Sequence, residues 1–115
     1  MILKKGDSIF VAHRRLFNGD IPRYFVGQVD DYEGGIVKTT GHSYARDEMS
    51  GRVIGKLDAR TRIFALFSGA LMVYLLPHTV EIENVRFAIL ADEVVLTDGK
   101  EFSMNLAEHA HDGRV

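Results

Sequence analysis

Short runs rich in apolar and β-branched residues, separated by turns containing Gly or Asp, extend through most of the chain. Residues 8–13 are typical, with Ile9 and Val11 on one face and Phe10 and Ala12 on the other. Runs rich in Val, Ile, Phe, Tyr and Thr between such turns indicate β-strands. The pattern predicts an all-β fold, either a small β-barrel or a curved antiparallel β-meander.

The same pattern predicts the individual elements and their connections. We expect strands at residues 8–13, 23–33, 36–40, 53–57, 63–67, 70–76, 87–90, 93–97 and 102–106. Gly34-Gly35 and Asp98-Gly99 predict hairpin turns, the second a tight one, because these residues accept positive φ. Residues 41–51 are expected to form a looser, charged excursion. Residues 79–86 fit either a short helical turn or a strand.

One apolar run begins at Ile63 and ends at Leu76. It is shorter than the roughly 20 residues of a membrane-spanning helix, so no membrane span is expected. We interpret it as a hairpin of two strands that turns at Ser68-Gly69. Because both strands are apolar on both faces and one small sheet covers only one face, the run predicts a homo-oligomer that buries it.

Composition adds limits to this picture. The chain has 115 residues, 46% of them hydrophobic and 26% charged, and no cysteine. These values predict one globular domain over residues 1–106, with a disordered tail at residues 107–115. The absence of cysteine excludes disulfides and fits a reducing compartment, and the first residues do not resemble a signal peptide. We therefore expect a cytoplasmic protein.

Charge is distributed unevenly along the chain. Residues 1–62 carry eleven basic and eight acidic side chains, whereas residues 63–115 carry three and eight. Most arginines lie in the first part, interleaved with aromatic residues such as Phe17, Tyr32 and Tyr44. Guanidinium groups beside aromatic rings suit phosphates and unstacked bases. The candidate ligand-binding residues are Arg14, Arg15, Arg23, Tyr24, Arg46, Arg60 and Arg62.

Two alternatives compete with a ligand-binding role for these arginines. They can pair with neighbouring carboxylates such as Asp30, Asp47 and Asp58 on a solvated surface, or the basic part of one subunit can meet the acidic part of another. The net charge of −2 also weakens long-range attraction to a nucleic acid.

Other chemistry is not indicated. His42, Ser43 and Asp47 lie close in sequence but lack a nucleophile elbow, and a turn held by hydrogen bonds from Ser43 and Asp47 is the expected structure. The histidines are scattered except for His109 and His111 in the predicted tail, so no metal is expected. The glycines form no phosphate-binding loop, and no cofactor or catalytic residue is predicted.

Residues 50–58, with the sequence SGRVIGKLD, resemble the glycine-flanked valine strand of PRC-barrel domains, and residues 26–30 resemble it less closely. These six-stranded barrels occur in a ribosome-maturation factor and in a photosynthetic reaction-centre subunit, where they act as docking modules. Outside this motif the chain looks like a small bacterial protein. The resemblance implies a docking role and transfers no catalytic residue.

Together these observations predict a non-catalytic module for protein docking or self-association. The alternative function is binding of RNA or a phosphate ligand through the arginines and aromatic residues, and an enzyme ranks third.

Overall fold

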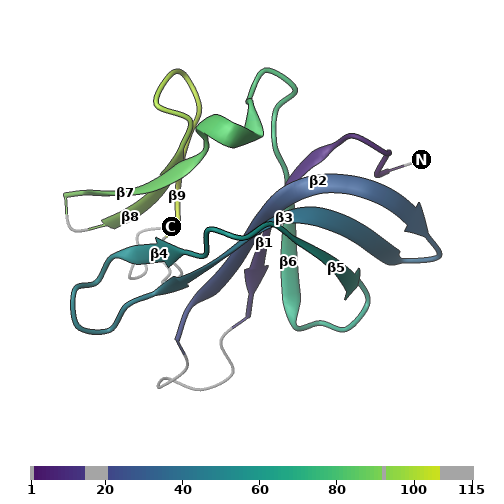
Figure 1. The fold of residues 1–115 in the computed structure, drawn as a ribbon, viewed down its shortest axis with the longest axis horizontal. Coiled ribbons are helices and arrows are strands. Elements are labelled where there is room, and N and C mark those ends of the chain that lie inside the picture. The colour runs from purple at the N-terminus through teal and green to yellow at the C-terminus, as the bar shows by residue number, and fades with distance from the viewer. Residues whose placement is uncertain (1, 15–20, 92, 107–115) are drawn as a thin grey trace, which may run out of the picture.

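The computed structural model describes residues 2–14, 21–91 and 93–106. Nine strands and one short 3-10 turn make up these segments (Figure 1). The elements are β1 (Ser8–His13), β2 (Arg23–Glu33), β3 (Ile36–Arg46), β4 (Val53–Gly55), β5 (Arg60–Ala65), β6 (Leu71–Leu75), η1 (Ile82–Asn84), β7 (Arg86–Leu90), β8 (Glu93–Thr97) and β9 (Ser103–Asn105). All strand pairs are antiparallel, which confirms the predicted all-β class.

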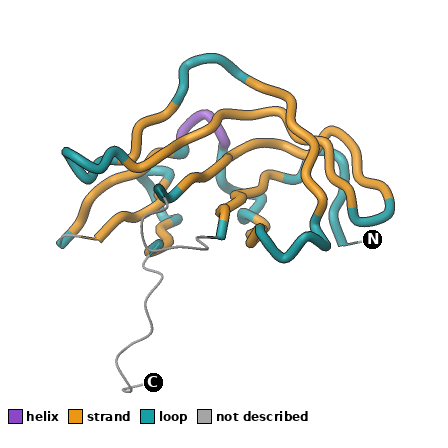
Figure 2. The backbone as a smooth tube through the Cα atoms, turned by 90° about the horizontal axis from the view of Figure 1, so that it is seen from below, coloured by secondary structure: helices purple, strands orange, loops and turns teal. Residues whose placement is uncertain are grey.

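The larger sheet has the order β4-β3-β2-β1-β6, and β5 also pairs with β3. The long strand β3 therefore has β5 beside its first half and β4 beside its last three residues. A bulge between Val29 and Asp31 interrupts the register of β2 with β3, and bulges increase the local bend of a strand. Figure 2 shows that the long strands are arched.

The predicted turns are largely confirmed. Gly34 and Gly35, with φ of 54° and 83°, connect β2 to β3 in a two-residue hairpin that pairs Glu33 with Ile36. The turn at Asp98-Gly99 connects β8 to β9, but it is not the predicted tight turn, because Thr97 pairs with Ser103. The Asp98 carboxylate accepts hydrogen bonds from the backbone N–H groups of Lys100 and Phe102, and these bonds stabilise the longer loop.

One predicted strand pairing is wrong. The strands of the apolar run do not form a hairpin, because β5 pairs with β3 and β6 pairs with β1. This pairing buries Phe64 opposite Val37, which a β5–β6 hairpin would not do. Since the described parts of β5 and β6 are not paired, the sheet is curved without closing into a barrel.

The segment after Thr40 is also more regular than expected. Residues 41–46 continue β3 instead of forming a loose excursion, because they pair with β2 on one side and β4 on the other. The open question about residues 79–86 is resolved as a 3-10 turn, η1, followed by the start of β7.

Each face of the larger sheet packs in its own apolar cluster. The first cluster lies inside the arch, and its buried residues are Leu3, Ile9, Val11, Phe25, Val29, Val37 and Phe64. The second lies between the larger sheet and β7-β8-β9, and its buried residues are Phe10, Tyr24, Val26, Leu76, Val80, Val85 and Leu96. The alternation of side chains along each strand therefore decides which of the two clusters a side chain packs in.

Phe87 of β7 anchors the smaller sheet on the larger one. Its ring centroid lies 5.3 Å from that of Tyr24, 4.7 Å from that of Tyr44 and 6.1 Å from that of Phe10. Such ring contacts add to the stabilisation from buried apolar area. No described helix is long and apolar enough to cross a membrane.

Candidate anion-binding site

A cleft of about 330 Å³ lies where the edge of β3 changes partner from β4 to β5. We call it the cationic cleft. Its lining residues are His13, Arg23, Tyr24, Phe25, Ser43, Tyr44, Ala45, Ile54, Lys56 and Arg62. Four of these can carry positive charge, and no described Asp or Glu lines the cleft.

The strand registers explain why these side chains meet. Arg23 pairs with Ala45 and Phe25 pairs with Ser43, and paired residues share a face. The backbone N–H of Lys56 donates to the Ser43 carbonyl oxygen at 2.9 Å, and the His42 ring nitrogen Nδ1 lies 3.2 Å from the Lys56 carbonyl oxygen. These contacts hold the residue that follows β4 beside the middle of β3.

Arg62 enters the cleft from β5. It pairs with Thr39, so it lies on the same face as Phe64 and the first cluster. Its guanidinium carbon lies 5.9 Å from the centroid of the Phe25 ring, within the range of a cation–π contact. The apolar ring therefore supports the guanidinium group without neutralising its charge.

The positive charges in the cleft act on His13. Burial, together with the nearby charges of Arg62 and Arg23, lowers the pKa of the His13 imidazole. The ring also makes an edge contact with Phe64, at a centroid distance of 6.2 Å. His13 is therefore neutral at pH 7 and is poised to take up a proton if negative charge enters the cleft.

Counter-ions are missing from the cleft. No ion pair joins Arg23, Lys56 or Arg62 to a carboxylate among the residues that the structure describes. Ser43 Oγ is fully buried and has no hydrogen-bond partner in the described part of the chain. A buried hydroxyl without a partner costs free energy.

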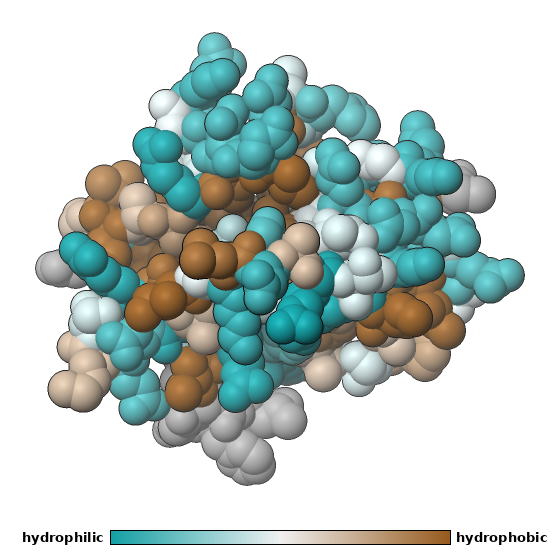
Figure 3. All heavy atoms as spheres, in the orientation of Figure 1, coloured by the Kyte–Doolittle hydropathy of each residue, from teal (hydrophilic) through white to brown (hydrophobic). Residues whose placement is uncertain are grey.

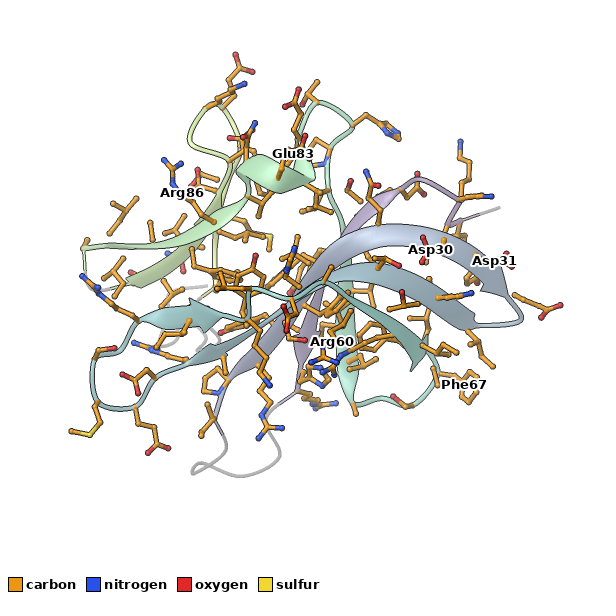
Figure 4. The ribbon with its side chains drawn as sticks, in the orientation of Figure 1. Asp30, Asp31, Arg60, Phe67, Glu83 and Arg86 are labelled. Atoms are coloured by element: carbon orange, nitrogen blue, oxygen red, sulfur yellow. The ribbon has the colours of Figure 1, made fainter. Side chains whose placement is uncertain are left out.

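The sequence-predicted site residues divide between the two faces of the sheet. Arg23 and Arg62 line the cationic cleft, and Arg60 lies at the start of β5 (Figure 4). Arg60 is two residues before Arg62 and so lies on the same face of that strand. Arg14 instead lines a different cavity, described below. Arg46 donates from Nε to the Gly51 carbonyl oxygen at 3.0 Å and stabilises the turn before β4.

Two further predicted residues, Tyr24 and Arg15, do not contribute a charged group to the described part of the cleft. Tyr24 lies mainly in the second cluster, where its ring stacks on those of Phe10 and Phe87 and only 7% of its surface is exposed. Arg15 lies outside the described residues, as do Phe17 and the predicted tail with His109 and His111. Within the described residues no group of three His, Asp or Glu side chains could hold a metal ion.

Sequence reasoning missed His13, Ser43 and Lys56. The sequence signal for His13 was its position two residues after Val11 and four after Ile9. Alternate residues of a strand share a face, so His13 lies on the face that Phe25 also occupies. The turn predicted from Ser43 and Asp47 is half right. Hydrogen bonds from the Ser50 side chain and from its backbone N–H, which donates to Asp47 Oδ2 at 3.1 Å, lower the pKa of the Asp47 carboxyl. Ser43 instead lies in β3.

Comparison of the chain with family models, with curated proteins and with solved structures finds no match.

Proposed function

We propose that this chain is a non-catalytic binding module and that its cationic cleft takes the phosphate group of a small ligand. The observation that carries the proposal is the gathering of His13, Arg23, Lys56 and Arg62 around one cleft with no carboxylate among its described lining residues. Planar guanidinium groups match phosphate oxygens with paired hydrogen bonds. The cleft volume, about 330 Å³, lies in the range of small-molecule sites.

A small phosphate ligand is favoured over an RNA strand. Stacking platforms for bases need exposed ring faces. The ring of Phe25 is 1% exposed and carries Arg62 over it, and Tyr24 is 7% exposed. Tyr44 packs against Phe87, and burial raises the pKa of its phenol. The aromatic residues of the cleft are therefore committed to the core, which leaves the cations as the recognition elements.

Inorganic pyrophosphate is expected to bind the protein at low ionic strength. Its affinity should fall about fivefold or more between 10 and 150 mM salt, because the Debye length shortens from about 30 to about 8 Å. Isothermal titration calorimetry measures both affinities. The absence of binding at low salt and millimolar pyrophosphate would refute the proposal.

A single-stranded RNA titration separates the ligand classes. If a short RNA binds more tightly than pyrophosphate and with a salt slope that grows with RNA length, the module binds nucleic acid instead of a small phosphate ligand. We expect a short RNA to bind through its terminal phosphate alone, with an affinity no higher than that of pyrophosphate.

A second function, self-association, is supported by the exposed strands β5 and β6. Ile63 is 70% exposed, Phe67 is 74% exposed and Leu75 is 53% exposed. Figure 3 shows an apolar patch over the end of β5. On the outer edge of β6 the N–H and C=O groups of Leu71, Val73 and Leu75 point away from β1, since Leu76 and Ala70 hydrogen-bond across to it. We propose that a second copy of the chain covers this surface, in line with the docking role that the PRC-barrel resemblance implies.

The paired substitution Ile63→Lys and Leu75→Lys is expected to convert a dimer to a folded monomer, because charges on edge strands oppose strand pairing. Both side chains are more than half exposed, so the fold should tolerate the change. Leu71 and Val73 are unsuitable positions, since both pack against the first cluster. Sedimentation velocity measures the result. A wild-type chain that stays monomeric at high concentration would contradict self-association.

A further inference from the structure

A second cavity, of about 430 Å³, lies on the opposite face of the larger sheet, where β1 and β6 meet β9. Its walls are mostly apolar and come from both sheets. The apolar lining residues with large side chains are Phe10, Tyr24, Met72, Tyr74, Met104 and Leu106. A concave apolar cavity with a few polar groups at its edge is the usual form of a small-molecule site.

The exposed apolar surface of the walls belongs to Tyr74 and Met72, which are 36% and 52% exposed, and buried aromatic rings support it. The Phe10 ring stacks against Tyr24 at 5.5 Å and against Tyr74 at 5.7 Å, with interplanar angles of 29° and 30°. Met72 and Met104 face this aromatic layer from different sheets. Methionine side chains are flexible and polarisable, and they make favourable contacts with aromatic rings.

The charge of Arg14 indicates that the ligand of this cavity carries a negative group. Arg14 is the only described lining residue with a permanent charge, and neither Asp nor Glu is among the lining residues. The backbone N–H of Arg14 donates to the Ala70 carbonyl oxygen at 2.7 Å, which fixes its place at the end of β1. An unopposed guanidinium at the edge of an apolar cavity complements a carboxylate on the ligand.

We propose that this cavity binds a small aromatic carboxylate, with its ring between the two methionines and its carboxylate at Arg14. The two cavities share His13 and Tyr24 as lining residues, but Arg14 lines only this cavity and Arg23 lines only the cationic cleft.

Methionine methyl resonances test the site directly, with 2-naphthoate as the probe. In protein labelled with ¹³C at the methionine methyl groups, the Met72 and Met104 signals should shift in a saturable manner as 2-naphthoate is added. Met49 is 94% exposed and does not line the cavity, so its signal is the internal control. The proposal is wrong if Met72 and Met104 do not shift or if Met49 shifts equally.

The neutral analogue 2-naphthamide tests the role of charge. We expect it to bind about fivefold more weakly than 2-naphthoate, and the Arg14→Gln variant should remove this difference. Arg14 is exposed, so the variant should fold. The matched control Arg62→Gln alters the cationic cleft and should retain the preference. Equal binding of both probes to the wild type would overturn the carboxylate assignment.

Discussion

Replacing Gly41 by alanine is expected to lower the free energy of unfolding by about 3 kcal/mol, a large part of the stability of a small domain. Gly41 of β3 pairs with Gly27 of β2, and the two backbones lie close together at this pair. A Cβ atom on Gly41 would overlap the Val26 carbonyl oxygen and lie 2.5 Å from Gly27 Cα. Both contacts are backbone contacts, and β3 is also paired with β5 at this point, so the strands cannot move apart cheaply.

Urea denaturation followed by far-ultraviolet circular dichroism measures this cost. Gly69→Ala is the matched control, since Gly69 has φ of 76° and no atom within 4 Å of a Cβ placed there. Its cost should be only that of the left-handed conformation, about 1 kcal/mol. Equal destabilisation by the two substitutions would show that β2 and β3 are farther apart than the structure indicates.

Removing two arginines from the cationic cleft is expected to weaken pyrophosphate binding about 100-fold. Each hydrogen bond between charged partners contributes about 1.5 kcal/mol or more, and the Arg23→Gln, Arg62→Gln variant loses two such donors. Arg23 and Arg62 are exposed, so the variant should remain folded. Calorimetric titration at 150 mM salt, where distant charges are screened, gives the affinity.

The matched control is Arg52→Gln, Arg86→Gln, which changes the net charge equally at two exposed arginines outside the cleft. Its effect should be about twofold, the weak long-range effect of lost charge in salt. If the two double variants weaken binding to the same extent, pyrophosphate responds to the overall field of the protein and not to the cleft.

The strands could be predicted from the sequence where local patterns decide. The glycine pair at Gly34-Gly35 and the strand over residues 23–33 depend on neighbours in the chain, and both are confirmed. The partners of β5 and β6 could not be predicted in this way. β5 and β6 are consecutive and apolar, but β5 pairs with β3 and β6 pairs with β1. This arrangement buries Phe64 and packs Leu71 and Val73 against the first cluster.

The site could be predicted only in part for a related reason. Composition identified Arg23 and Arg62 as candidates, but it could not show that they share a face with His13. Arg23 and Tyr24 are adjacent in one strand and therefore point to opposite faces of the sheet, which could be predicted from the sequence. Lys56 and Ser43 meet through a hydrogen bond between distant segments, which requires the fold itself.

The proton resonances of the His13 ring test phosphate binding in the cationic cleft most directly. In the free protein their titration midpoint should lie below the ordinary pKa of 6.5, since burial, Arg62 and Arg23 all disfavour the imidazolium. Bound pyrophosphate adds negative charge, so it should raise the pKa of His13, and binding should tighten as pH falls toward that midpoint. The His78 resonances serve as an internal reference, since His78 does not line the cleft. A His13 midpoint that saturating pyrophosphate leaves unchanged would contradict an anion site in the cationic cleft.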